Sequence, residues 1–146
     1  MLVKLLPEQI SEYWDIIKYA VENSLPPIAN EAYDKMNRIL EALLCDSMQC
    51  WVLYSEIEDK RKLEAVVVTT LSTDLSSGVR SLMVYSLYGF SDLSDEAWKS
   101  GYETLARWGK GLGCNRVTAY TDVPKVCEVV KNLGGEARYM FVSLPL

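Results

Sequence analysis

The amino-acid sequence predicts one domain of the mixed α/β (α+β) class, spanning residues 1–146, in which a mixed central sheet is flanked by helices. Three observations lead to this class. Residues 8–23 have the apolar spacing of a helix, residues 50–88 have repeated strand signals, and helical and strand-like segments alternate from residue 95 onward. The expected order is β-α-α-β-β-β-α-β-α-β. With 146 residues, of which 49% are hydrophobic, the chain can bury a core of its own.

The N-terminal segment predicts a short strand followed by a helix. Residues 2–6 are apolar except for Lys4, and Pro7 fits the first turn of a helix better than a central strand. Residues 8–23 predict one amphipathic helix, because their apolar residues recur at helical spacing. The predicted buried stripe of this helix comprises Ile10, Tyr13, Trp14, Ile17 and Val21.

A second helix is expected after Pro26 and Pro27, which end the first one. Asn30 is its predicted N-cap, because an asparagine side chain can accept a hydrogen bond from a free backbone N–H group. Glu31 and Asp34 favour the same helix start through their interaction with the helix dipole. The predicted buried stripe comprises Met36, Ile39, Leu40, Leu43 and Leu44.

Three strands are expected next, at residues 50–54, 63–71 and 79–88. The run from Ala65 to Val68 is apolar at every position, which is typical of a central strand that is covered on both faces. A charged turn at residues 56–62 separates the first two strands. Its basic residues 60–62 are surrounded by acidic ones, so we interpret them as a solvated turn and not as a nucleic-acid patch.

The last third of the chain predicts alternating helices and strands. Ser94 is the predicted N-cap of a helix at residues 95–113, and Gly113 ends this helix. Pro124 begins the last helix. This last helix extends to residue 133. A strand at residues 116–120 is expected before it, and a closing strand at residues 137–144 is expected after it.

Composition excludes several classes of function. The chain has no histidine, and its four cysteines form no CxxC pair, so we expect no metal site and no histidine-based catalysis. The net charge of −5 disfavours nucleic-acid binding. No apolar run is long enough to cross a membrane, and the first residues do not have the pattern of a signal peptide. We therefore expect a cytoplasmic protein that binds neither nucleic acid nor membrane.

The element order and three segments, residues 50–88, 108–114 and 129–135, resemble the GCN5-related N-acetyltransferase (GNAT) superfamily over essentially the whole chain. The resemblance implies that backbone N–H groups at a helix N-terminus hold the pyrophosphate of coenzyme A. Tyr85 and Tyr88 are separated by an odd number of residues, which predicts that one packs inward and the other lines a cleft. The candidate cofactor-binding residues are Tyr85, Leu87, Tyr88, Ser94 and Lys99.

The residues at this implied cofactor site depart from the family pattern. Where the family has a Gln/Arg-x-x-Gly-x-Gly/Ala loop, this chain has Ser94, Asp95 and Glu96. A carboxylate about 4 Å from a phosphate oxygen costs roughly 4 kcal/mol at an effective dielectric constant of about 20. Two carboxylates offset most of a micromolar affinity, which is worth about 8 kcal/mol. We therefore expect the protein to bind no cofactor. If it is an active enzyme, the expected cofactor is acetyl-coenzyme A.

The catalytic group that the resemblance implies is also missing. Val130 aligns with the tyrosine that often protonates the departing thiolate in this family, and a valine has no proton to donate. No catalytic residue is therefore assigned from the sequence. Tyr120, Tyr139 and Glu64 are the candidates that could substitute for the missing tyrosine.

Three functions follow from these observations. The first is a GNAT-fold protein with a degenerate acetyl-coenzyme A site that acts as a non-catalytic binding or assembly module. Residues 48–52, 85–89 and 119–122 look like segments of short GNAT-like proteins of tailed bacteriophages, which implies a phage or prophage origin and a place in the host cytoplasm or the virion. The expected partner is another protein or a second copy of the chain in a homodimer.

The second function is an active acyl-coenzyme A-dependent N-acetyltransferase with atypical cofactor binding, in which Lys99 or Lys110 reaches a phosphate. The third is an inhibitor that uses its acidic surface to bind a host enzyme. Binding of acetyl-coenzyme A separates the second function from the other two, because only an enzyme of this class requires the cofactor.

Overall fold

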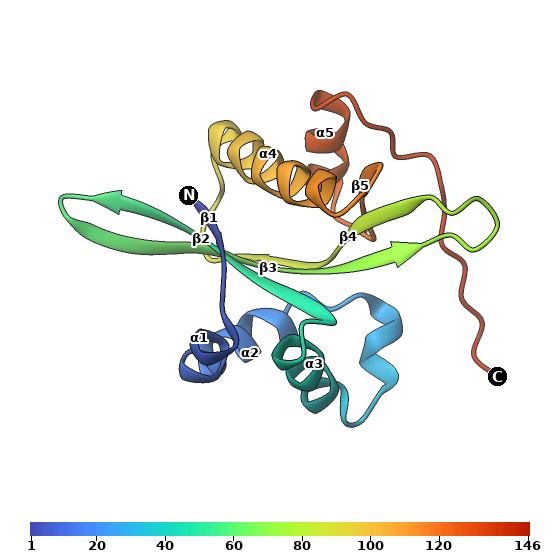
Figure 1. Ribbon diagram of the computed structural model, residues 1–146, viewed down its shortest axis with the longest axis horizontal. Helices are drawn as coiled ribbons and strands as arrows, with labels where there is room; N and C mark the ends of the chain where they lie inside the picture. Colours follow the sequence, from blue (N-terminus) through green and yellow to red (C-terminus); the bar gives the residue numbers. More distant parts are fainter.

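The computed structural model describes residues 1–146, apart from the side chains of residues 30 and 31. Five strands form one sheet in the order β1-β2-β3-β4-β5 (Figure 1). The strands from β1 to β4 pair with one another in antiparallel orientation, and β5 runs parallel to β4. Their bounds are Leu2–Lys4 for β1, Met48–Ile57 for β2, Lys60–Thr73 for β3, Arg80–Gly89 for β4 and Arg116–Ala119 for β5.

Helices cover both faces of this sheet (Figure 1). Three helices and a 3₁₀ turn lie on one face, and two helices lie on the other. The first group comprises α1 (Pro7–Glu12), α2 (Trp14–Glu22), the 3₁₀ turn (Pro27–Glu31) and α3 (Lys35–Leu44), and the second comprises α4 (Asp95–Gly111) and α5 (Pro124–Asn132). The predicted mixed sheet with flanking helices is confirmed.

The central strand β3 divides two apolar cores. Val66 and Val68 are buried in the core formed with α1, α2 and α3, whereas Val67 is buried in the core formed with α4. Alternate side chains of a strand point to opposite faces, so a strand between two helical layers needs apolar residues at consecutive positions. The apolar run in this strand is therefore accounted for.

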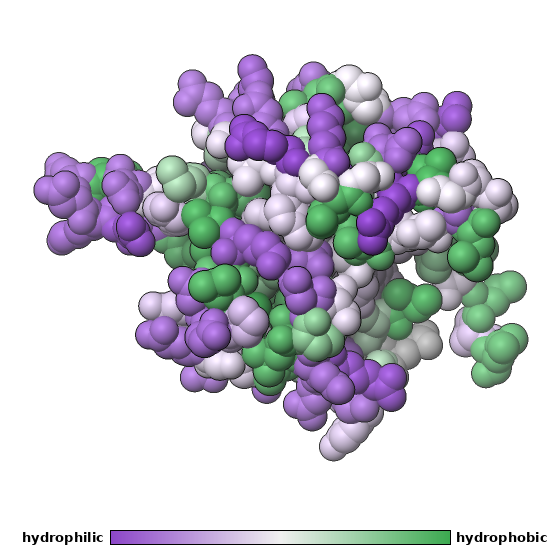
Figure 2. Space-filling model, viewed as in Figure 1, coloured by the Kyte–Doolittle hydropathy of each residue, from purple (hydrophilic) through white to green (hydrophobic). Residues whose placement is uncertain are grey.

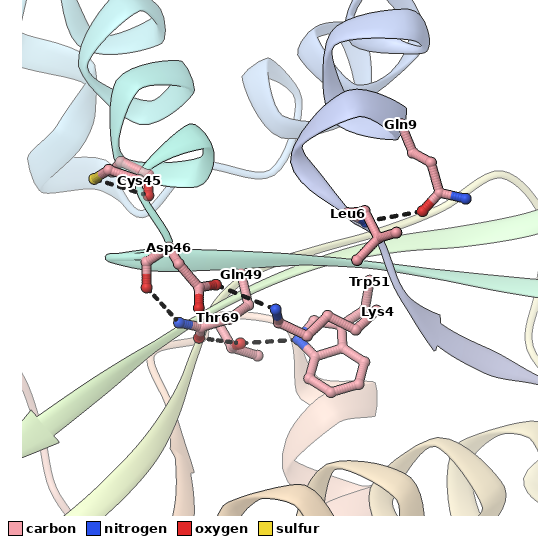
Figure 3. Close-up of polar contacts among 9 residues, drawn as sticks. Lys4, Leu6, Gln9, Cys45, Asp46, Gln49, Trp51 and Thr69 are labelled. Atoms are coloured by element: carbon pink, nitrogen blue, oxygen red, sulfur yellow. Dashed lines mark hydrogen bonds and ion pairs between the residues drawn. The ribbon is translucent and has the colours of Figure 1, made fainter.

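A buried polar chain links β2 to β3 on the α4 face (Figure 3). The indole N–H of Trp51 donates to the hydroxyl of Thr69 at 2.9 Å, and that hydroxyl donates to the side-chain oxygen of Gln49 at 2.9 Å. The amide nitrogen of Gln49 donates to the backbone oxygen of Asp46 at 3.2 Å, and the Asp46 carboxylate pairs with Lys4 at 3.2 Å. The buried polar groups of Gln49, Trp51 and Thr69 each have a partner, which offsets the cost of burying them.

The first predicted helix is divided in two at Tyr13. The backbone of Tyr13 has φ −104° and ψ 20°, which departs from helical geometry, although its N–H still donates to Gln9. The bend turns the Tyr13 side chain outward, so that it is 51% exposed instead of buried as predicted. The other members of the predicted stripe, Ile10, Trp14, Ile17 and Val21, do pack in the core.

The second helix begins later than predicted. Its first residue is Lys35 and its N-cap position is Asp34, whereas the predicted N-cap side chain, Asn30, lies outside the described residues. Residues 27–31 form a 3₁₀ turn instead of the first turn of α3. Of the predicted stripe, Leu44 is 40% exposed because it lies at the last turn of the helix.

The hairpin between β2 and β3 is tighter than the predicted charged turn. Ile57 pairs directly with Lys60, so only Glu58 and Asp59 form the turn, both with positive φ. Positive φ at both central residues is the geometry whose twist matches the twist of the strands. The basic residues 60–62 consequently belong to β3, where they are exposed.

The predicted closing strand at residues 137–144 is wrong. This segment follows α5 as an exposed chain without strand pairing (Figure 1). Its residues have strand-forming side chains, but a strand also needs a neighbour for its backbone N–H and C=O groups. Among the described residues, this segment pairs with no strand of the sheet.

Neither a membrane-spanning helix nor a metal site occurs among the described residues. Within the described part of the chain, no helix is long and apolar enough to cross a membrane. Among the same residues, no group of cysteine, aspartate and glutamate side chains is arranged to hold a metal ion.

Burial of Cys50 predicts a loss of stability at alkaline pH. Burial raises the pKa of the Cys50 thiol to about 12, well above its ordinary value. At pH values between the pKa of this thiol in the unfolded chain and its pKa in the folded chain, the folded chain binds more protons than the unfolded chain. The free energy of unfolding therefore falls by up to about 1.4 kcal/mol for each unit of pH increase. Urea unfolding of the wild-type chain and Cys50→Ala tests this prediction. The stability difference between the two should shrink by about 2 kcal/mol from about pH 7.5 to pH 10.5, and a constant difference would contradict it.

Candidate functional site

The last five residues of β4 extend beyond the end of β5. Pairing between the two parallel strands runs from Ser81 opposite Arg116 to Val84 opposite Ala119. Residues 85–89 continue β4 without a β5 partner, because the chain turns away toward α5. We call residues 85–89 the unpaired end of β4. Its free backbone groups can bind an extended ligand in the manner of an added strand.

A β-bulge marks the beginning of the unpaired end of β4. Val68 of β3 pairs with Ser86 and Thr69 pairs with Val84, so Tyr85 is an extra residue that pairs with no residue of β3. A bulge resets the alternation of side chains along the strand. As a result, Tyr85 and Tyr88 both pack against the core beneath α2, and the prediction that they lie on opposite faces is wrong. Leu87 packs against the α4 side instead.

Three aromatic rings form a row from α2 to the unpaired end of β4. The rings of Tyr19 and Tyr88 meet edge to face with centroids 5.8 Å apart, and those of Tyr88 and Phe90 do so at 5.0 Å. The hydroxyl of Tyr19 beside it raises the pKa of Tyr88. Tyr19 was not predicted from the sequence, although an aromatic residue on the outer face of an amphipathic helix indicates a contact beyond the core.

The N-terminus of α4 is capped by the chain itself. The Ser94 hydroxyl accepts a hydrogen bond from the Ala97 N–H at 3.1 Å, which confirms Ser94 as the N-cap. Asp95 and Glu96 follow in the first turn, where their negative charge stabilises the positive end of the helix dipole. Lys99 lies one turn further along, with its side chain exposed. The first turn of α4, at which the family resemblance implies a phosphate, therefore has two carboxylates.

The three candidate catalytic residues are not brought together. Glu64 is half-buried on β3 and accepts a hydrogen bond from Ser55 at 3.3 Å. Tyr120 follows β5, is 54% exposed and has its ring 5.5 Å from that of Phe141. Tyr139 is 78% exposed in the chain that follows α5, and its hydroxyl accepts from Arg138 at 3.0 Å.

The end of α5 is closed by a tight turn at Val130. The Gly135 N–H donates to the Val130 oxygen at 2.9 Å. A Cβ added at Gly135 would lie 2.8 Å from Cγ1 of Val130, closer than two such atoms can approach. A side chain larger than that of glycine at this position therefore does not fit this turn.

A hollow of about 480 Å³ lies on another part of the surface. It faces β1 and β2 along the C-terminal half of α4, where Lys4 lies 5.9 Å from the Trp108 ring. No candidate site residue of β4 lines it. Its lining residues are Trp51, Thr104, Arg107, Trp108, Gly111 and Leu112.

Known proteins resemble this chain in structure but not in sequence. The sequence matches no protein-family model and no curated protein. A probable acetyltransferase has a similar structure, with a TM-score of 0.71 and 12% identity over 100% of this chain and 97% of that chain. The ribosomal-protein-alanine N-acetyltransferase from Brucella melitensis biovar Abortus 2308 gives a TM-score of 0.66 and 11% identity over 100% and 99% of the two chains.

A third similar structure is an aminoglycoside N-acetyltransferase in complex with coenzyme A. It has a TM-score of 0.65 and 13% identity over 100% of this chain and 98% of that chain. The three likenesses span the whole sheet and both helical layers described above. The chain therefore has the fold of the GNAT superfamily.

Proposed function

We propose that this protein is a GNAT-fold binding or assembly module that does not transfer acetyl groups. The observation that carries this proposal is the N-terminus of α4. Ser94 caps it, and Asp95 and Glu96 occupy its first turn. A helix N-terminus binds a phosphate through free N–H groups and the positive end of its dipole. Here Ser94 accepts from one of these groups, the N–H of Ala97, and Asp95 and Glu96 place negative charge at that end of the dipole.

The chemistry expected of an acetyltransferase also lacks support. Val130, at the position of the family's thiolate-protonating tyrosine, has no titratable group. Tyr120 and Tyr139 are both mainly exposed to solvent, and the contacts described for them are with Phe141 and Arg138, not with the unpaired end of β4. A general acid must be held within hydrogen-bonding reach of its substrate, so neither residue has the support that this role requires.

Acetyl-coenzyme A should leave the melting temperature of the wild-type chain unchanged. A ligand at 1,000 times its dissociation constant stabilises the native state by about 4 kcal/mol, so a micromolar binder at about 1 mM is readily detected. Calorimetric titration should likewise show no saturable heat.

The matched variant for this experiment is Asp95→Asn combined with Glu96→Gln, which removes two charges and keeps the size of both side chains. If the carboxylates exclude the phosphates, this variant should gain weak coenzyme A binding that the wild-type chain lacks. Saturable binding by the wild-type chain, followed by acetylation of any amine, would overturn the proposal.

An N-acetyltransferase with atypical cofactor binding is the second candidate function. The unpaired end of β4 beside β5 favours it, because this edge can accept an extended pantetheine arm through backbone hydrogen bonds. Structures with the same fold include an enzyme in complex with coenzyme A. The titration described above separates the two functions.

A phage or prophage origin, with a place in the virion, is the setting that we propose for the binding module. It rests on the resemblance of residues 48–52, 85–89 and 119–122 to phage proteins of this fold. Mass spectrometry of purified particles tests it, because a virion component copurifies with the particle through a density gradient. Loss of the protein during this purification would count against a place in the virion.

A further inference from the structure

The hollow along the C-terminal half of α4, called the α4 hollow below, is lined by two tryptophan rings. The rings of Trp51 from β2 and Trp108 from α4 meet edge to face with centroids 5.3 Å apart. The hydrogen bond from the indole N–H of Trp51 to Thr69 fixes the first ring (Figure 3). Trp108 is half-buried, so part of it remains accessible from solvent. The volume of about 480 Å³ is within the range of protein binding sites, roughly 300–1,000 Å³.

Gly111 leaves the α4 hollow open. It is the last residue of α4 and lines the hollow, and a Cβ added to it would meet no atom within 4 Å. Glycine is less favourable in a helix than alanine. The nearby Gly109 is explained by packing, because an added Cβ would lie 3.5 Å from the Leu82 side chain. Gly111 has no such neighbour, so a larger side chain there would extend into open space beside the two rings.

Cations border the α4 hollow, although the whole chain has a net charge of −5. Arg107 lines the hollow with its side chain exposed. Glu103 lies one turn earlier on α4, but Arg107 forms no ion pair among the described residues. The guanidinium of Arg80 donates to the backbone oxygen of Leu112, which also lines the hollow, at 2.8 Å. Figure 2 shows hydrophilic and hydrophobic surface side by side where Figure 1 places the C-terminal end of α4.

Lys4 adds a third cation, 5.9 Å from the centre of the Trp108 ring. Its partner is Asp46 at 3.2 Å, whose side chain is 65% exposed, so solvent screens this pair. Lys4, Arg80 and Arg107 therefore outnumber the two nearby carboxylates, Asp46 and Glu103. A positive region on a negative chain attracts an acidic ligand and orients it as it approaches.

We propose that the α4 hollow binds an acidic segment of a partner protein, with one aromatic side chain of the segment against Trp51 and Trp108 and a neighbouring carboxylate on Arg107. Tryptophan and arginine are enriched among the residues that dominate protein–protein interfaces. A guanidinium binds a carboxylate through two parallel hydrogen bonds, which also fixes its orientation. The inference rests on the proposed binding function and names the chemistry of the partner.

A synthetic peptide, Asp-Asp-Trp-Asp-Asp with blocked ends, tests the proposal on the full ¹⁵N-labelled chain by NMR titration. The chain has four tryptophans. The peptide should shift the indole N–H signals of Trp51 and Trp108 and leave those of Trp14 and Trp98 unchanged. A peptide with asparagine at the four acidic positions, and one with alanine in place of tryptophan, should each bind at least tenfold more weakly. Added salt should weaken binding of the acidic peptide.

Two glycine variants locate the binding. Gly111→Leu should weaken peptide binding by tenfold or more, because leucine occupies the space of the α4 hollow. Gly101→Leu is the matched control: Gly101 lies on the same helix, also has no atom within 4 Å of an added Cβ, and does not line the hollow. This control should bind the peptide as the wild-type chain does. Arg107→Gln should weaken binding about tenfold and reduce its dependence on salt. All three variants should keep the circular dichroism of the wild-type chain.

Several outcomes would overturn the proposal. They are no peptide binding, equal binding of the acidic and asparagine peptides, an unchanged affinity in Gly111→Leu, or shifts confined to Trp14 and Trp98. Indole-3-acetate that binds as tightly as the peptide would also overturn it, because the occupant would then be a small aromatic acid. Coenzyme A binding is measured separately. A chain that binds neither the peptide nor coenzyme A refutes this inference alone, and a chain that binds the peptide but also acetylates an amine refutes the proposed function alone.

Discussion

Leu82→Ala should lower the free energy of unfolding by about 3 to 4 kcal/mol, the largest effect that we expect from one substitution in this chain. Leu82 is fully buried on β4, between Leu71 of β3 and Val117 of β5 in the pairing of the strands. It also lies directly under α4, where a Cβ added at Gly109 would be 3.5 Å from its side chain. The cavity that alanine leaves is enclosed on all these sides and cannot collapse readily.

Thermal or urea unfolding measures this loss. A decrease of about 3 kcal/mol corresponds to a fall in melting temperature of about 6–12 °C for a chain of this size. Leu75→Ala makes the same chemical change at a side chain that is 98% exposed, and it should alter stability by less than about 0.5 kcal/mol. Equal effects of the two substitutions would mean that α4 does not cover β4 as described.

Thr69→Val should destabilise the protein by about 2 to 3 kcal/mol. The Thr69 hydroxyl accepts a hydrogen bond from Trp51 and donates one to Gln49, and all three side chains are buried. Valine fills the same space without a hydroxyl, so both partners lose a hydrogen bond and have no access to water. The midpoint of urea unfolding should fall while its slope stays constant.

Ser86→Ala is the matched control for the loss of a buried hydroxyl. The Ser86 hydroxyl is also buried, but it has no hydrogen-bond partner among the described residues. Its removal should be neutral or should stabilise the protein by up to about 1 kcal/mol, because an unpaired buried hydroxyl is unfavourable. If both substitutions destabilise equally, the loss at Thr69 does not come from its hydrogen bonds.

The mixed fold could be predicted from the sequence because its signals are local. Apolar spacing located α2 and α4, and Ser94 followed by two acids identified the start of α4. The run Ala65–Val68 predicted a strand with two covered faces before either covering layer was known. Each of these features depends on residues within one or two turns of each other, or on one strand.

The same local rules failed where a distant contact decides the structure. Strand periodicity predicted opposite faces for Tyr85 and Tyr88, but the bulge against Val68 and Thr69 places both beneath α2. No residue of β4 by itself specifies this bulge, because it arises from the pairing of two strands. Tyr19 was missed for a similar reason, since its contact with Tyr88 crosses from a helix to the sheet.

The sequence by itself determined the chemistry of the candidate site. The absence of histidine, the acids at the start of α4 and the valine at residue 130 are properties of side chains, and no fold can change them. Only the tertiary structure decided which groups meet. A strand is stable only where a neighbouring strand pairs with its backbone groups. Residues 85–89 of β4 have a free edge because β5 ends before them, and the strand-like residues 137–144 pair with no strand of the sheet.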